Sequence, residues 1–357
     1  MPFAAGLLAD LGADVLRIES PGPDLGVADE SRAVHLRGRG AVTVDLRDAD
    51  SVQVVRDLAA TADVLLEGFR PGVLERRGLA PDDLLARNPR LIIGRMTGWG
   101  QDGPLAQSAG HDIDYLAVAG PLRHFARAGE TPVPPLNLVA DFGGGAMFLV
   151  TGVLAALVER ATSGRGQVID AAMVDGSAYL MMLVYSLAAQ GMWNPDRPGS
   201  NLLDTGAPFY DVYRCADGEY LAVGCLEPQF YALFLEGLGL ADTELPHQFD
   251  MERWPELRQI FTDTIARRSR AEWEDVFAGS DACVAAVRSM TEAADHPHLR
   301  ARGTFLSAEP LQPAPAPRFS RTSPQAVPRS EFPMGAAALQ QWGIDEARAE
   351  RTAVNPG

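Results

Sequence analysis

The first hundred residues alternate between helical and extended apolar patterns. Helical spacing of apolar positions predicts helices over residues 3–11, 51–61, 73–77 and 81–87. Short apolar runs bounded by glycine or polar residues predict strands over residues 13–19, 41–45, 62–67 and 91–96. Strands that alternate with helices of about ten residues are typical of parallel βαβ units. We therefore expect an α/β fold with an open, doubly wound parallel sheet.

The pattern changes after about residue 190, where residues 194–199 form a turn-rich break. Two extended runs, 210–213 and 219–223, flank a short polar turn and predict a β-hairpin. Helical patterns follow at 229–238, 254–267 and 270–278, and a last one runs over 334–349. The middle of the chain is therefore expected to form a smaller α+β domain.

Two apolar stretches raise the question of a membrane segment. Residues 146–158 are too few to cross a bilayer. Residues 171–193 contain Asp175, Gly176 and Ser177, and are interpreted as a buried helix.

Composition narrows the classes of function. A hydrophobic fraction of 46% with 22% charged residues indicates a globular protein. A net charge of −16 argues against nucleic acid and anionic membrane partners. Three cysteines, Cys215, Cys225 and Cys283, have no metal-like spacing and suggest reduced thiols. With no export signal visible, we expect a cytoplasmic protein.

Residues 110–115 contain His111 at the start of a predicted helix. Histidine is the commonest general acid or base. Free amides at a helix start could also hold a thioester oxygen as it becomes an enolate. A capping or purely structural histidine is the alternative.

Asp141 and Glu227 are candidate carboxylates. Asp141 follows an apolar segment and precedes three glycines, so it could be an ordinary helix N-cap. The glycines exceed what a cap needs and imply close approach of backbone or ligand. Glu227 ends an apolar strand before a helix. It could be a helix-start carboxylate or an orienting partner for an imidazole.

Arginines cluster near predicted strand ends, where an α/β sheet can bind phosphate in the crevice at the carboxyl edge. They are Arg37, Arg39, Arg47, Arg70, Arg76 and Arg77. A solvated surface role is the default for any one of them. There is no phosphate-binding loop, no dinucleotide fingerprint and no serine nucleophile elbow. His296 and His298 lack supporting ligands, so no metal site is expected.

Several ordered motifs resemble the class III CoA-transferase superfamily, and within it the acyl-CoA racemases. They lie at residues 8–15, 67–72, 97–104, 110–115, 164–170, 216–218 and 315–319. The resemblance implies a large CoA-binding α/β domain from both chain ends, residues 1–190 and 310–357, and a small α+β domain at 200–309. It also implies an interlocked homodimer with active sites shared between subunits.

The resemblance assigns roles to the candidate residues. His111 and Asp141 would be the two bases that remove and return the α-proton of a 2-methylacyl-CoA, with Glu227 supporting the histidine and the Asp112 amide holding the enolate. No cofactor is implied, because CoA is part of the substrate. The implied substrate and CoA contacts are Arg37, Val44, Asp45, Leu46, Arg47, Gly68, Phe69, Arg70, Arg76, Gly110, Ile113, Asp114 and Tyr115.

The sequence departs from the family pattern in two places. Family members carry a strand and a glycine-rich turn before the helix that here begins at Phe3, and the lack of that strand would remove buried sheet surface. Ser20 stands where related racemases have an arginine that contacts CoA. Two other functions remain open: a CoA transferase in which Asp141 forms an acyl anhydride, and an inactive, truncated CoA-binding paralogue.

Overall fold

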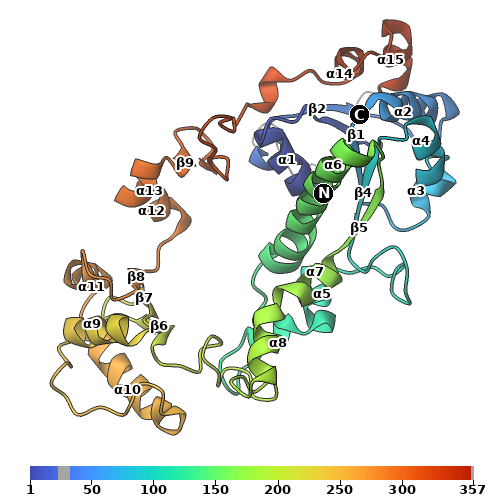
Figure 1. The fold of residues 1–357 in the computed structure, drawn as a ribbon. Helices are drawn as coiled ribbons and strands as arrows, with labels where there is room; N and C mark the ends of the chain where they lie inside the picture. The colour runs from blue at the N-terminus through green and yellow to red at the C-terminus, as the bar shows by residue number, and fades with distance from the viewer. Residues whose placement is uncertain (23–32, 355–357) are drawn as a thin grey trace. The chain divides into compact units, whose positions relative to one another are not determined.

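A computed structural model describes residues 1–22 and 33–354 of the chain (Figure 1). The chain folds into two compact units. The first unit contains residues 1–119, 136–180 and 301–357, so both chain ends contribute to it. The second contains residues 120–135 and 181–300. Residues 120–135 and 181–190, which we had placed in the large domain, thus belong to the second unit.

The first unit is α/β with parallel strands, as the alternating pattern predicted. Strand β1 (Leu16–Glu19) pairs with β2 (Gly40–Thr43), and β4 (Ile92–Thr97) lies between β3 (Val64–Glu67) and β5 (Val168–Ala172). The described residues form two separate parallel sheets, of two and three strands, so the single continuous sheet we predicted is wrong. Among the described residues, no strand of the β1–β2 pair is hydrogen-bonded to a strand of the β3–β4–β5 sheet.

Helices cover these sheets in the first unit. The helices of its first half begin and end close to the predicted positions. They are α1 (Pro2–Asp10), α2 (Ala49–Thr61), α3 (Val73–Arg76), α4 (Pro81–Arg87) and α5 (Asp112–Ala119). From the far end of the chain, α14 (Ala336–Gln341) packs on β2 and α15 (Glu346–Thr352) packs on α2. Figure 1 shows these last two helices, in red, beside the blue N-terminal elements.

Two hydrophobic clusters form the core of the first unit. One joins Val42 and Val44 to the inner faces of α2 and α4 and to Leu339 of α14. The other joins Ile92 of β4 to the inner face of α6 (Met147–Ser163). Strand β4 is buried along its whole length, because it has a strand on each side and helices above and below.

A π-helix, η4 (Leu138–Ala146), runs directly into α6. One of the two interpretations of Asp141, an ordinary helix N-cap, is wrong because helical hydrogen bonding already begins at Leu138. The combined run Leu138–Ser163 has 26 residues and is long and apolar enough to cross a membrane by length and composition. The prediction that its apolar part is too short was therefore wrong. Its inward face packs on β4 and β5, and 39% of its most apolar window is buried.

The predicted buried helix at 171–193 is two helices, α7 (Met173–Leu180) in the first unit and α8 (Met182–Ala189) in the second. No residue of α8 is buried, so that prediction was wrong for this half. The described residues cover its apolar side chains only in part.

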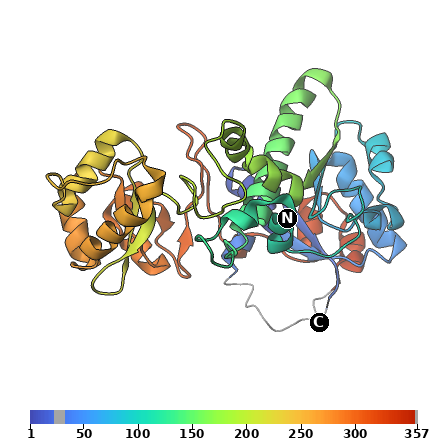
Figure 2. The same cartoon turned by 90° about the horizontal axis from the view of Figure 1, so that it is seen from below.

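The second unit contains the predicted hairpin, β6 (Tyr210–Arg214) and β7 (Tyr220–Gly224), extended by β8 (Val284–Ala286) into an antiparallel sheet. Three helices surround it: α9 (Pro228–Leu238), α10 (Trp254–Ile265) and α11 (Arg270–Phe277) (Figure 2). Phe209, Phe234, Phe261 and Trp273 fill its core.

Candidate active site

His111 occupies the N-terminus of α5, as the sequence predicted. Its carbonyl oxygen accepts the amides of Asp114 at 2.9 Å and Tyr115 at 3.2 Å. Its own amide donates to the Asp114 carboxylate at 2.9 Å. These bonds fix the backbone of His111 while its side chain remains exposed. The imidazole is thus presented at a helix start beside amides that can meet an anion.

Tyr115 accounts for the glycines next to the histidine. Its hydroxyl donates to the Gly110 carbonyl at 2.5 Å, and its ring meets the Trp99 ring edge-on at 4.9 Å. A Cβ at Gly98 would lie 2.2 Å from the Tyr115 ring, and one at Gly110 would lie 2.8 Å from it. Both glycines are therefore needed for this aromatic packing, which holds the 110–115 loop. Burial raises the pKa of Tyr115, and the nearby Asp141 carboxylate adds to this.

Asp141 lies within η4 and is half-buried. Asn137 donates from Nδ2 to Asp141 Oδ2 at 3.4 Å. Burial raises the pKa of Asp141, whereas the Asn137 bond and the His111 imidazole act to lower it. A carboxylate made less acidic by burial is a stronger base, which suits proton abstraction.

Two of the three glycines after Asp141 allow close packing of η4 against α7. A Cβ at Gly144 would lie 2.8 Å from the Ser177 amide nitrogen, and one at Gly176 would lie 1.9 Å from the Gly144 carbonyl oxygen. A Cβ at Gly145 would lie 2.8 Å from the Met173 side chain. Of the two explanations for these glycines, close approach of backbone is the one that this packing of η4 against α7 supports.

Asp112 joins the two candidate bases. Its side chain is buried, and its Oδ2 accepts the amides of Ala140 and Asp141, both at 2.8 Å. Asp112 directly follows His111 in the chain, and its carboxylate accepts the backbone amide of Asp141. The residue next to one candidate base is therefore hydrogen-bonded to the backbone of the other. The structure therefore brings His111 and Asp141 together. The Asp112 amide is at the first position of α5 and has no acceptor among the described residues.

The loop at residues 68–70, predicted to contact CoA, is held by a buried ion pair that the sequence patterns did not reveal. Glu67 accepts the Phe69 amide at 2.7 Å and Arg95 Nε at 2.5 Å. Arg95 also donates to Glu75 at 2.7 Å. The signal was an arginine inside the apolar strand β4, because a buried arginine requires a partner.

The predicted contacts at 44–47 differ in exposure. Val44 is fully buried and its amide donates to the Glu19 carbonyl at 2.7 Å. Leu46 packs on the core, and Arg47 is exposed beside Asp45 at 2.8 Å. The Arg47 side chain lowers the pKa of Asp45 to about 2. Arg47 thus offers the exposed cation of this segment.

The remaining arginines are either hydrogen-bonded within the fold or exposed to solvent. Arg37 donates to both carboxylate oxygens of Asp10 and to Gln312 and Pro313, so its guanidinium is largely used within the fold. Arg70 and Arg76, at the end of β3 and in α3, are exposed. Ile113 and Asp114 are exposed on the first turn of α5.

Glu227 belongs to the second unit, at the N-cap of α9. Its side chain is exposed and makes no capping hydrogen bond, so the helix-start position does not use the carboxylate as a cap. Its charge acts on Cys283, whose pKa is raised by burial and, secondarily, by Glu227.

The described residues contain no group of three histidine, cysteine or acidic side chains placed to hold a metal ion. Cys215 and Cys225 are buried and free, and Cys283 is exposed and free.

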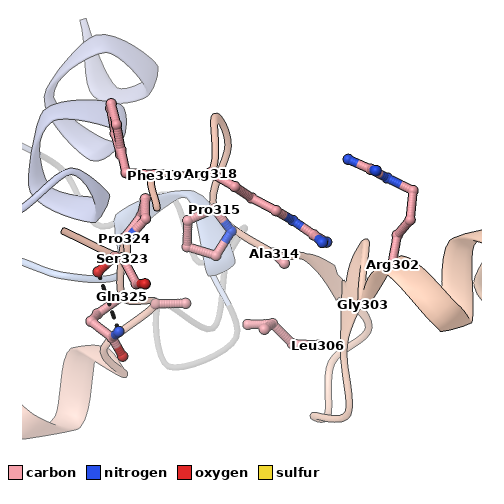
Figure 3. Close-up of a pocket in the computed structure, with 11 residues that line it drawn as sticks. Arg302, Gly303, Leu306, Ala314, Pro315, Arg318, Phe319, Ser323, Pro324 and Gln325 are labelled. Atoms are coloured by element: carbon pink, nitrogen blue, oxygen red, sulfur yellow. Dashed lines mark hydrogen bonds between the residues drawn. The ribbon is translucent and has the colours of Figure 1, made fainter. Parts of the chain in front are cut away.

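A surface cavity of about 490 Å³ lies elsewhere in the first unit (Figure 3). Arg302 and Arg318 line it together with Leu306, Phe319 and Gln325. None of the predicted site residues lines this cavity, and it holds no group suited to act as a base. The hydrogen-bonded residues around His111 and Asp141 are the better candidate site.

The sequence and fold now define the class. Residues 1–336 match the model of CoA-transferase family III. The chain belongs to this family.

Individual members of the family show closer similarity to this chain. The chain is 48% identical over 332 residues to the alpha-methylacyl-CoA racemase of Mus musculus, covering 92% of this chain and 85% of the mouse protein. It is 45% identical over 323 residues to the racemase of the same name from Homo sapiens, covering 90% and 83%. A crystal structure of a CaiB/BaiF family protein from Brucella suis has the same fold, with a TM-score of 0.76 at 23% identity, covering 96% of this chain and 95% of that one.

Proposed function

We propose that this chain is an isomerase that interconverts the (R)- and (S)-epimers of 2-methylacyl-CoA thioesters. Similarity to two curated racemases over about nine-tenths of the chain supports this assignment. The observation that carries it is the placement of His111 and Asp141 on two elements joined by the Asp112 carboxylate. An acid–base pair held at one place is what a reaction that moves one proton at a stereocentre requires.

His111 and Asp141 act as the two bases. A thioester acidifies its α-carbon, and removal of that proton gives an enolate. One base takes the proton from one face of the carbon and the other, in its protonated form, returns a proton to the opposite face. Burial raises the pKa of Asp141, which makes its carboxylate a stronger base.

The enolate oxygen is stabilised by the amide of Asp112. This amide lies at the first position of α5, where backbone donors and the helix dipole favour an anion. Glu227 is proposed to orient the His111 imidazole, fixing its tautomer and raising its basicity, as carboxylates do for other catalytic histidines. The reaction as written needs no cofactor, and full activity in EDTA is expected.

The CoA part of the substrate is proposed to lie against residues 44–47, 68–70, Arg76 and the 110–115 loop. Exposed arginines at the ends of β2 and β3 suit its phosphate groups. Arg37 is proposed to contribute mainly by holding α1 against residues 312–313, because its donors are already engaged.

A homodimer with shared sites is proposed from the surface of α8. Leu183 and Tyr185 are 60% and 63% exposed, and no residue of this helix is buried. An apolar patch of this kind marks an interaction surface. Leu183→Arg should give monomers by light scattering, whereas the control Met290→Arg, at another exposed apolar position, should leave the dimer intact. A monomeric wild-type protein would contradict the proposal.

The cytoplasm is proposed as the location, on the ground that all three cysteines are free thiols.

Incubation of one epimer of a 2-methylacyl-CoA in D₂O tests the function. Racemisation predicts deuterium at C2 together with formation of the other epimer, in the absence of any acceptor acid. A CoA transferase, in which Asp141 would form an acyl anhydride, would instead require an acceptor acid. Strict dependence on an acceptor would therefore overturn the proposal.

A further inference from the structure

Asp112 caps a helix that is distant in sequence. Asp112 is 5% exposed, and its Oδ2 accepts the Ala140 and Asp141 amides, which lie 28 and 29 residues further along the chain. Both amides belong to η4, whose own N-cap residue Asn137 provides no side-chain capping bond. The first amides of a helix have no acceptor within it, and a carboxylate is favoured there. The residue that follows His111 thus supplies the cap of the helix that contains Asp141.

This cap also connects the two candidate bases through one peptide bond and a hydrogen bond. His111 and Asp112 are neighbours in the chain, and two hydrogen bonds join Asp112 to the successive amides of Ala140 and Asp141. The other oxygen, Oδ1, is buried and has no hydrogen-bond partner among the described residues. The carboxylate therefore acts on η4 through Oδ2 alone.

The charge of Asp112 acts on the same base. Burial is the main cause of the raised pKa of Asp141, and the Asp112 carboxylate acts in the same direction. The groups that oppose it are the Asn137 amide, the amino group of Met1 before α1 and His111. Removal of the Asp112 charge should therefore lower the pKa of Asp141.

We propose that Asp112 is a positioning residue whose carboxylate sets the placement of Asp141 relative to His111. This inference rests on the proposed racemase function and is separate from the role given there to the Asp112 amide. It assigns to the side chain a task that does not require contact with the substrate.

Two substitutions separate position from charge. Asp112→Asn keeps an oxygen acceptor for the two amides and removes the charge, and its amide group replaces Oδ1, where no existing bond is lost. Asp112→Ala removes both the acceptor and the charge. Asp345→Ala is the matched control, because Asp345 caps α15 by accepting the Arg348 amide at 3.0 Å.

Amide hydrogen exchange provides a readout that does not depend on activity. A peptide that contains Ala140 and Asp141 should be protected in the wild type and in Asp112→Asn, and should exchange roughly tenfold faster in Asp112→Ala. Asp345→Ala should leave this peptide unchanged. Equal protection in Asp112→Ala and the wild type would overturn the inference.

The rate profile provides the second readout. Asp112→Ala should lower kcat about 100-fold with little change in KM, because a small displacement of a base is costly. Asp112→Asn should lower kcat only several-fold, and should move the acidic limb of kcat/KM to lower pH as the pKa of Asp141 falls. If Asp112→Ala does not fold, Asp112→Asn still provides a test, because it keeps the cap. An unchanged acidic limb in Asp112→Asn would contradict the effect of the Asp112 charge on the pKa of Asp141.

Failure of the two proposals can be told apart. If the wild type does not racemise but the exchange pattern is as expected, the racemase proposal is wrong while the positioning of Asp141 by Asp112 is supported. If the wild type racemises and Asp112→Ala retains its kcat, the positioning role is wrong.

Discussion

Around His111 and Asp141 the protein uses buried hydrogen bonds, whereas around the residues proposed for CoA it uses exposed charge. The Asp112 carboxylate and the Tyr115 hydroxyl each bind backbone at a defined distance. Arg70 and Arg76 are exposed on the surface. Proton transfer demands placement within fractions of an ångström, while phosphate groups are held by charge that tolerates some movement. Substitutions at the first place should therefore change kcat, and those at the second should change KM.

His111→Ala should have the largest effect. Loss of one of the two bases is expected to lower kcat/KM for racemisation by about 1,000-fold, within the range typical of general acid–base groups. Circular dichroism of the variant should match the wild type, because the His111 side chain is exposed. Steady-state racemisation from either epimer measures the effect, and a loss smaller than about tenfold would show that His111 is not a base.

Arg95→Met tests the support of the 68–70 loop. It leaves the Glu67 carboxylate buried without its partner, and should lower the free energy of unfolding by about 3 kcal/mol and raise KM. Glu75→Gln removes the more exposed partner of Arg95 and should cost less than about 1 kcal/mol. Denaturant melts compare the two, and equal losses would mean that the buried pair has no special role.

Gly176→Ala tests the close packing of α7 against η4. The added Cβ would meet the Gly144 carbonyl oxygen at 1.9 Å, so α7 or η4 must shift. We expect a loss of about 2 kcal/mol in the free energy of unfolding and a lower kcat, because η4 contains Asp141. Gly22→Ala is the control, since no atom of the described residues outside its chain neighbours lies within 4 Å of its Cβ position. A fully stable and active Gly176→Ala protein would refute this packing.

Arg76→Ala should have the smallest effect and should act on KM alone. We expect a rise of about tenfold in KM at unchanged kcat, as for the loss of one charged contact to a phosphate. The difference from the wild type should shrink at high ionic strength. Arg253→Ala, an exposed arginine of the second unit, should change neither constant. A fall in kcat for Arg76→Ala would contradict the proposed division between residues that set kcat and residues that set KM.

Much of the α/β unit was predictable because its signals are local. The apolar spacing of α2 and α4 and the start signals of α5 and α9 depend on neighbouring residues, and all four helices were placed within two residues. Asp141 was misplaced as an N-cap because a π-helix has no distinct sequence pattern. Its cap is a carboxylate 29 residues earlier, which no local rule detects.

The misjudged burial of α8 has a different cause. Its apolar sequence is typical of a core helix, yet burial depends on what packs against a helix and not on its composition. The Glu67–Arg95 pair could not be predicted from local sequence patterns either, because it joins β3 to β4 through the register of the sheet.

The most direct test of the account follows each epimer separately in D₂O with two variants, His111→Ala and Asp141→Asn. If the two residues serve opposite faces of the α-carbon, each variant should lose exchange at C2 for one epimer and retain more of it for the other, and the retained epimer should differ between the variants. Loss of exchange for the same epimer in both variants, or equal loss for both epimers, would contradict the assignment of one base to each face.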